Sequence, residues 1–133
     1  MGIEVEMVLR LLLAAALGAA VGFQREKAGK QAGLRTHVLI CVGAALITVT
    51  SIHGFGAAAD PSRVAAGIVV GIGFLGAGVI LRRSEGIVAG LTTAATIWAV
   101  AGIGLAAGAG LFLPAAVVTA IVLIVLLIPH TIG

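Results

Sequence analysis

The sequence predicts an all-α integral membrane protein with five transmembrane helices. Of its 133 residues, 61% are hydrophobic and only 10% are charged, and the mean hydropathy is +1.27. A water-soluble domain normally carries about a quarter charged residues, so lipid must be the solvent for most of this exterior. The 20 glycines fit the same class, because small residues let membrane helices approach closely.

Five apolar stretches provide the helices, since a bilayer core is crossed by about 17 to 25 helical residues. The first follows two acids and no base, the reverse of a secretory signal, so we expect a retained helix. A basic loop at residues 24–36 separates it from the second stretch. The expected helical ranges are 5–23, 37–53, 64–81, 91–109 and 113–128.

The third stretch begins after Asp60 and Pro61. This is a strong helix start, because Asp caps a first turn and Pro is tolerated within it. A short turn at 84–90 precedes the fourth stretch, and a break at 110–114 precedes the β-branched fifth. We expect a single membrane domain over residues 1–133, with no soluble C-terminal domain in this chain.

Lysine and arginine in the short loops predict the orientation, because they favour the cytoplasmic side. The first loop holds four bases, and Arg82 and Arg83 follow the third stretch, whereas the loop between the second and third stretches holds only Arg63. We therefore expect the N-terminus outside and the C-terminus in the cytoplasm, in a bacterial inner membrane.

A pseudo-repeat relates the first two stretches to the next two. Residues 29–36 and 86–93 share the pattern Gly-x-x-Ala-Gly-Leu-x-Thr, and residues 17–21 resemble 75–79. This predicts two parallel helical hairpins plus a fifth helix. The alternative is chance similarity in a sequence rich in Gly and Ala.

Each copy of this segment leads into a helix N-terminus, where free N–H groups and the helix dipole favour an anion. We expect a cytoplasmic site for a lipid head group, a phosphate or an acidic partner segment. The alternative is that the threonines cap helices while the bases set topology and meet anionic lipid. The candidate residues are Arg25, Glu26, Arg35, Thr36, Arg82, Thr92 and Thr93.

A second group of charges is expected at the outer face, formed by Arg10, Asp60 and Arg63. Asp60 either caps the third helix or pairs with Arg10 or Arg63. Arg10 either pairs with Glu6, one turn earlier, or extends toward the membrane interface.

Glycines leave more than one face of the third stretch without side chains. We expect tight helix packing there, with helix unwinding or a homodimer face as the alternatives. These glycines are Gly71, Gly73, Gly76 and Gly78.

The other side chains form no catalytic or metal-binding pattern in the sequence. Cys41 lies within an apolar run, where a small buried residue is expected. His37 and His53 lie near the ends of stretches, where ordinary solvation suffices. We expect no enzyme, no cofactor and no metal site. We also expect no nucleic-acid partner, because the bases lie in short loops between apolar stretches.

Several motifs resemble, in order and spacing, the N-terminal membrane domain of the MgtC/SapB family. They are Arg25-Glu26 and residues 32–37, 60–63, 71–78 and 90–98. The resemblance implies an inner-membrane protein for adaptation to low magnesium and, in pathogens, for survival inside host cells. Longer members add a soluble domain. At Gly67 this chain departs from the family pattern, in which a polar residue, commonly Gln, is expected.

The same resemblance implies either regulation of other inner-membrane proteins, such as the ATP synthase, or transport of Mg²⁺ or another ion. A Mg²⁺ path should offer carboxylates to the ion, and an acid at the membrane midplane would indicate one. All five acids lie at or outside the interfaces: Glu4, Glu6, Glu26, Asp60 and Glu85. The sequence therefore favours a regulator or adaptor, with a pore lined by backbone carbonyls as the alternative.

Overall fold

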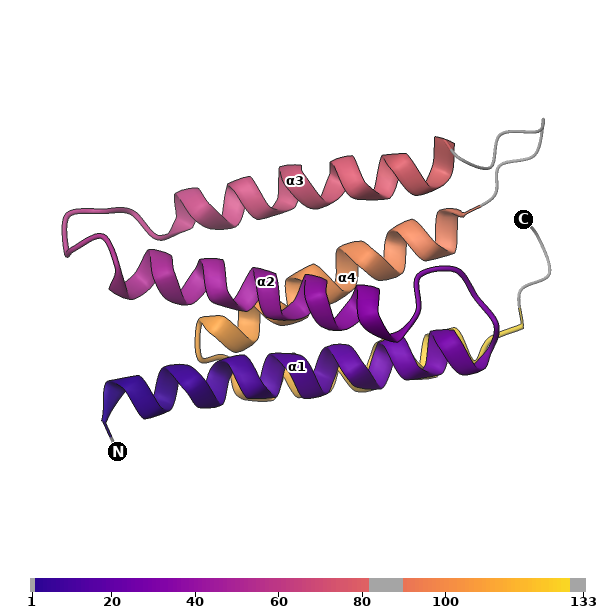
Figure 1. Cartoon of the computed structure of the whole chain (residues 1–133), viewed down its shortest axis with the longest axis horizontal. Helices are drawn as coiled ribbons and strands as arrows, with labels where there is room; N and C mark the ends of the chain where they lie inside the picture. Colours follow the sequence, from indigo (N-terminus) through magenta and orange to yellow (C-terminus); the bar gives the residue numbers. More distant parts are fainter. Residues whose placement is uncertain (1, 82–89, 130–133) are drawn as a thin grey trace.

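A computed structural model of the chain describes residues 2–81 and 90–129 as a bundle of five α-helices (Figure 1). Four of these helices are long and apolar enough to span a membrane. The fifth is just as apolar but has 15 residues, or about 22 Å at the usual helical rise. The helices are α1 (Ile3–Lys27), α2 (Leu34–His53), α3 (Ser62–Leu81), α4 (Leu91–Gly108) and α5 (Phe112–Leu126).

The expected all-α fold is confirmed, and the helices follow the apolar stretches closely. The largest difference lies at the end of α1, which continues to Lys27 where the sequence predicted a loop from residue 24. Arg, Glu and Lys are good helix formers, so the helix extends past its apolar part into the polar segment. The orientation in the membrane and the crossing by α5 stay predictions.

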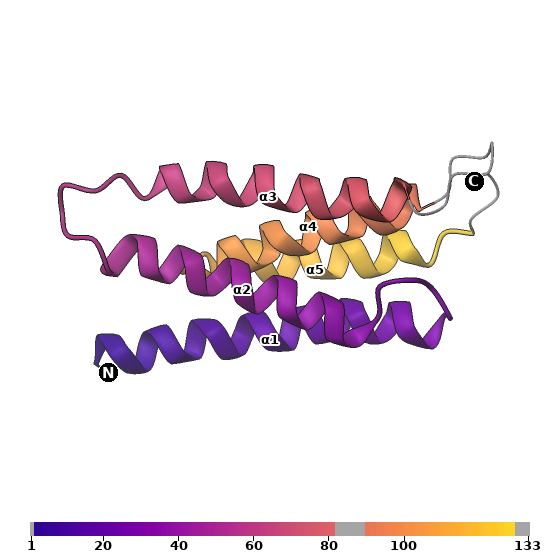
Figure 2. The ribbon, with the colours of Figure 1, turned by 45° about the horizontal axis from the view of Figure 1, so that its top comes forward.

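α2 packs against both α1 and α4, and glycines on these two helices form the contacts (Figure 2). A Cβ atom added to Gly18 would lie 2.8 Å from the carbonyl oxygen of His37, and one added to Gly108 would lie 2.6 Å from that of Ala45. No side chain fits in either place, so the backbones are in contact, as in other small-residue helix pairs. The glycines confined in this way are Gly18 and Gly22 on α1 and Gly104 and Gly108 on α4.

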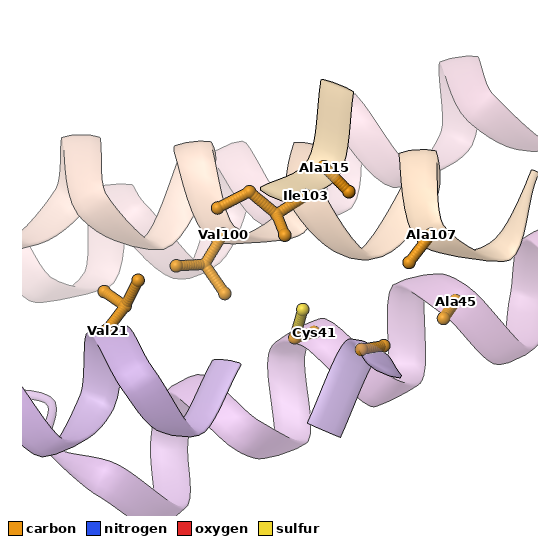
Figure 3. Packing of buried hydrophobic residues seen from close by; sticks show 8 residues of the cluster. Val21, Cys41, Ala45, Val100, Ile103, Ala107 and Ala115 are labelled. Carbon is orange, nitrogen blue, oxygen red and sulfur yellow. The ribbon is translucent and has the colours of Figure 1, made fainter. Parts of the chain in front are cut away.

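Small side chains form the core where α1, α2, α4 and α5 meet (Figure 3). Val21, Cys41 and Val100 are completely buried there, and Ile103 is its largest side chain. Moving an apolar side chain from lipid into the protein interior contributes little free energy, because both surroundings are apolar. Close van der Waals packing therefore holds such helices together.

α3 lies at the edge of the bundle, against α4 and in lighter contact with α2 (Figure 2). A Cβ atom on Gly76 would lie 3.4 Å from that of Ala94, whereas one on Gly71, Gly73 or Gly78 would have no atom within 4 Å. Within the chain, α3 therefore makes only an ordinary contact at Gly76 and no close contact at the other three glycines, because an edge helix packs along one line only. α3 is also a continuous helix and is not unwound in this conformation.

The pseudo-repeat stays a prediction, because its second copy begins in residues 82–89, which lie outside the described residues. The equivalent glycines also differ in conformation. Gly33 has φ −95° and Gly90 has φ +83°. The left-handed residues of the first copy are Gly29, with φ 71°, and Ala32, with φ 58°, so the glycines that precede α2 and α4 are not superimposable.

Candidate functional site

Basic residues collect at one end of the bundle, where α1 and α5 end and α2 and α4 begin (Figure 1). We call this the basic end. Arg82, which was also expected here, lies outside the described residues. The described bases are Arg25, Lys27, Lys30 and Arg35.

Arg25 is the buried charge of the basic end. It lies in the last turn of α1, and only 3% of its surface is exposed. Its Nη2 donates to the carbonyl oxygen of Gln31, at 2.7 Å, and to the hydroxyl oxygen of Thr93 on α4. Its Nε has no hydrogen-bond partner, and no carboxylate of the described residues pairs with it. A buried charge without a counter-ion is unfavourable, so Arg25 is a candidate ligand-binding group.

A pocket of about 470 Å³ lies beside Arg25, between the end of α1, the beginning of α4 and the end of α5. We call it the Arg25 pocket. One wall is polar and the other is apolar. The polar wall includes Gln24, Arg25, Lys30, Gly90, Thr92 and Thr93, and the apolar wall is formed by Val125, Leu126, Leu127, Ile128 and Pro129.

Glu26 binds the N-terminus of α2, where the sequence predicted an external anion. Its Oε1 accepts a hydrogen bond from the backbone N–H of Leu34, at 3.2 Å. A carboxylate is favourable there through both the hydrogen bond and the helix dipole. Both helices have a glycine at the N-cap, Gly33 and Gly90, but among the described residues no side chain accepts from the first N–H groups of α4 as Glu26 does for α2. The beginning of α4 is therefore the better candidate for an external anion.

Arg35 and Thr36 do not join the Arg25 pocket, whereas Thr92 and Thr93 line it. Arg35 and Thr36 lie on the first turn of α2, where both are exposed, whereas the following residue, His37, is buried. Consecutive helical residues point about 100° apart, so a turn that buries His37 directs its neighbours outward. Arg35 and Thr36 therefore do not share the Arg25 pocket, and their part in an anion site stays a prediction.

Two buried polar groups near Arg25, the imidazole of His37 and the Oε1 atom of Gln31, were not predicted. His37 was expected to be solvated but is completely buried, with Nδ1 3.0 Å from the carbonyl oxygen of Gly33 and no partner for Nε2. Gln31 has a buried, unpartnered Oε1. The spacing of Gly18 and Gly22 on α1 was the available signal, because it requires a backbone at close range, and the first turn of α2 supplies it.

At the opposite end of the bundle, the charge of Arg10 is balanced. It forms an ion pair with Glu6, the local alternative that the sequence left open. Its Nη1 also donates to the carbonyl oxygen of Gly108, at 3.0 Å. Gly108 is the last residue of α4, where the helix dipole favours a cation.

Asp60 caps α3 and is not joined to Arg10 or Arg63 by an ion pair. Its Oδ1 accepts hydrogen bonds from the backbone N–H of Ser62, at 3.0 Å, and from the Ser62 hydroxyl, at 2.7 Å. Both hydrogen bonds lower the pKa of the Asp60 carboxyl, and the bond from the Ser62 hydroxyl has the larger effect. The expected three-residue charge site at this end is therefore not assembled, because each acid has a partner close to it in sequence.

Between the two ends, the hydroxyl groups bond within their own helices. Thr48 donates to the carbonyl oxygen of Ala44, at 2.7 Å, and Thr119 donates to that of Ala115, at 2.8 Å. Within residues 2–81 and 90–129, no three His, Cys, Asp or Glu side chains are grouped as a metal site would require. The hydroxyl groups of Thr48 and Thr119 are therefore already engaged within their helices.

Apolar helices around a small-residue core, with charged groups at both ends, define a polytopic membrane protein. Large side chains such as Phe74 and Val70 are mostly exposed on its outside, at 83% and 75%, as a surface in lipid requires. The model of the MgtC family matches residues 11–133. The chain belongs to the MgtC family.

Relatives in three bacteria illustrate this membership. The chain is 50% identical over 114 residues to "Putative magnesium transporter YhiD" of Escherichia coli, covering 80% of this chain and 53% of the relative. It is 49% identical over 116 residues to "Protein MgtC" of Salmonella typhimurium, covering 87% and 49%. It is 41% identical over 117 residues to "Protein SapB" of Bacillus subtilis, covering 83% and 50%. The chain thus spans about half the length of these curated relatives. No solved structure matches it.

Proposed function

We propose that this chain is the membrane domain of a regulator or adaptor that contacts other bacterial inner-membrane proteins during adaptation to low magnesium. The observation that carries the proposal is the placement of the acids. Among the described residues, Glu4 and Glu6 lie at the start of α1, Glu26 near its end, and Asp60 just before α3. No described carboxylate lies along the apolar length of the helices, where an ion path would need one.

The chemistry of Mg²⁺ strengthens this argument. Mg²⁺ keeps several waters and binds through one or two carboxylates in octahedral geometry. The buried charge at the basic end is instead the guanidinium of Arg25, which repels a cation at that entrance. The interior hydroxyls of Thr48 and Thr119 are bonded to their own helices. The described interior thus offers Mg²⁺ no side-chain carboxylate, and these two hydroxyls are already engaged.

An exposed face of α3, which at Gly67 and Gly71 borders a groove beside α2, supports contact with a partner. Gly67, Gly71 and Gly78 would each hold a Cβ with no atom within 4 Å, and their spacing of four and seven residues places them on one helix face. A glycine surface makes few favourable contacts with lipid chains, whereas it lets the backbone of another helix approach closely. A helix of another membrane protein, or of a second copy of this chain, fits this face.

Transport is the competing function, because one relative carries the name of a magnesium transporter. Liposomes that contain the purified chain and an internal Mg²⁺-sensitive dye separate the two proposals. We expect Mg²⁺ entry no faster than in protein-free liposomes. Entry that rises with the amount of protein and saturates with Mg²⁺ would overturn the regulatory proposal.

A photoreactive side chain placed at Gly71 tests the partner contact in native membranes. We expect it to form a defined crosslinked product with a membrane protein. The same group placed at Val117, which is exposed on α5, should give none. Equal crosslinking from both positions would show random collision in the membrane and would contradict the α3 contact.

A further inference from the structure

An arginine lies at each end of α4, and only one of the two is balanced. At the C-terminal end, Arg10 pairs with Glu6 and donates to the carbonyl oxygen of Gly108. A cation is favoured there by the helix dipole. At the N-terminal end, Arg25 contacts Thr93, and the dipole opposes a cation at that position. The structure therefore concentrates positive potential at the beginning of α4.

Burial makes this charge at Arg25 unfavourable unless an anion joins it. The side chain is 3% exposed, its Nε is unpartnered, and no carboxylate of residues 2–81 or 90–129 pairs with it. Lys30 adds a second cation to the wall of the same pocket. A guanidinium, an ammonium and a helix N-terminus are three groups that proteins commonly use to bind phosphate.

The beginning of α4 has donors available for such a group. Its N-cap residue, Gly90, is left-handed with φ +83° and carries no side chain that could cap the helix. Within residues 2–81 and 90–129, no side chain therefore accepts from the N–H groups of the first turn of α4. Gly90, Thr92 and Thr93 all line the Arg25 pocket, so these donors and Arg25 border the same space.

The opposite wall of the pocket distinguishes a lipid from a soluble anion. Val125 and Leu127, near and just beyond the end of α5, are 53% and 73% exposed and line the pocket with other apolar residues. A free phosphate gains nothing from an apolar wall, whereas a lipid can bury its glycerol and upper acyl chain against it. The pocket also lies at the end of the apolar helices, the depth at which lipid phosphates lie.

We propose that the Arg25 pocket binds the phosphate of an anionic phospholipid. Arg25, Lys30 and the N-terminus of α4 surround the phosphate, and the end of α5 contacts the acyl chain. The inference goes beyond the proposed function, because a bound lipid is compatible with regulation or transport.

Native mass spectrometry of the full chain in detergent tests the site. Phosphatidylglycerol is titrated into the protein, with phosphatidylcholine as the reference lipid. We expect the wild-type chain to retain phosphatidylglycerol in preference. Lys30→Gln should weaken this binding about five-fold, as the loss of one cation near a lipid phosphate predicts. Lys27→Gln is the matched control, because Lys27 is also exposed but does not line the pocket.

The apolar wall has its own pair of variants. Val125→Trp fills the pocket from α5 and should displace the lipid. Ile124→Trp adds the same bulk to the neighbouring residue, which is 63% exposed and lies outside the pocket, and it should bind lipid like the wild type. Both positions are exposed, so both variants should fold.

Three outcomes would overturn the proposal. The first is equal binding of the two lipids by the wild-type chain. The second is equal weakening by Lys27→Gln and Lys30→Gln, which would show diffuse attraction to the basic end. The third is full displacement of phosphatidylglycerol by inorganic phosphate that binds Val125→Trp as well as wild type, which would assign the site to a soluble anion. None of these readouts measures Mg²⁺ entry or crosslinking, so a failure here is distinct from a failure of the proposed function.

Discussion

Gly108→Ala should push α4 away from α2, because the added Cβ atom does not fit between the two helices. The new Cβ would lie 2.6 Å from the carbonyl oxygen of Ala45, 2.9 Å from its Cα and 2.9 Å from the Cβ of Thr48. None of these atoms belongs to the far end of a flexible side chain. Restoring an ordinary contact of 3.4 Å to the carbonyl oxygen requires the helices to part by about 0.8 Å at this point.

The magnitude follows from this displacement. A gap of 0.5–1 Å removes about a quarter to a half of the attraction between packed atoms. Overpacking a close contact lowers the free energy of unfolding by about 1–3 kcal/mol. Gly102→Ala is the matched control on the same helix, because its Cβ would have no atom within 4 Å. It should raise the stability by up to about 1 kcal/mol through helix propensity.

Unfolding by sodium dodecyl sulfate, followed by maleimide labelling of Cys41, measures both variants. Cys41 is completely buried in the core that α2 forms with α1 and α4, so labelling reports separation of these helices. We expect Gly108→Ala to label at a lower detergent fraction than wild type, and Gly102→Ala at an equal or higher one. Equal midpoints for the two variants would refute the close α2–α4 contact.

Three further predictions concern the charges at the end of the bundle opposite the basic end. Arg10→Met should lower the free energy of unfolding by about 1.5–3 kcal/mol in the same titration, because the charged hydrogen bond from Arg10 to the end of α4 is lost. Glu6→Gln keeps the hydrogen bond from Arg10 to Gly108, so it should lower the free energy of unfolding less. Asp60→Asn keeps an acceptor for the N-terminus of α3, whereas Asp60→Ala removes it, so hydrogen exchange in the first turn of α3 should accelerate only in the alanine variant. Because the hydrogen bonds from Ser62 lower the pKa of Asp60, its carboxylate stabilises the fold above its usual pKa. That stabilisation should disappear as the pH falls through the lowered value, and acid unfolding of Asp60→Asn should lack this component.

Hydropathy located the helices because each apolar run is bounded by charged residues or by helix-breaking residues. Asp60 and Pro61 placed the start of α3 closely, since capping is decided by a few neighbouring residues. The end of α1 was misplaced, because the polar residues through Lys27 are equally compatible with a loop and with a helical turn in water. The sequence pattern therefore locates the end of the apolar part of a helix more accurately than the end of the helix itself.

The packing of the glycines could not be predicted, because identical spacings have different surroundings. Gly104 and Gly108 are four residues apart on α4, and Gly67 and Gly71 are four residues apart on α3. The first pair is confined against α2, and the second has open space. The difference comes from the position of α3 at the edge of the bundle, which depends on every other helix contact and on no single motif.

The arginines at the two ends of α4 explain why one part of the charge arrangement was visible in the sequence and another was not. Arg10 has an acid, Glu6, one helical turn away, so a local ion pair was foreseeable and is present. Arg25 has no acid at the positions three or four residues away, which are Val21, Gly22, Ala28 and Gly29. Its neighbour Glu26 binds the N-terminus of α2 instead. A buried arginine at a helix end must then find its anion outside its own helix, and the described part of the chain offers none. In this chain, the absence of an acid one turn from Arg25 is therefore the part of the sequence pattern that agrees with an anion site.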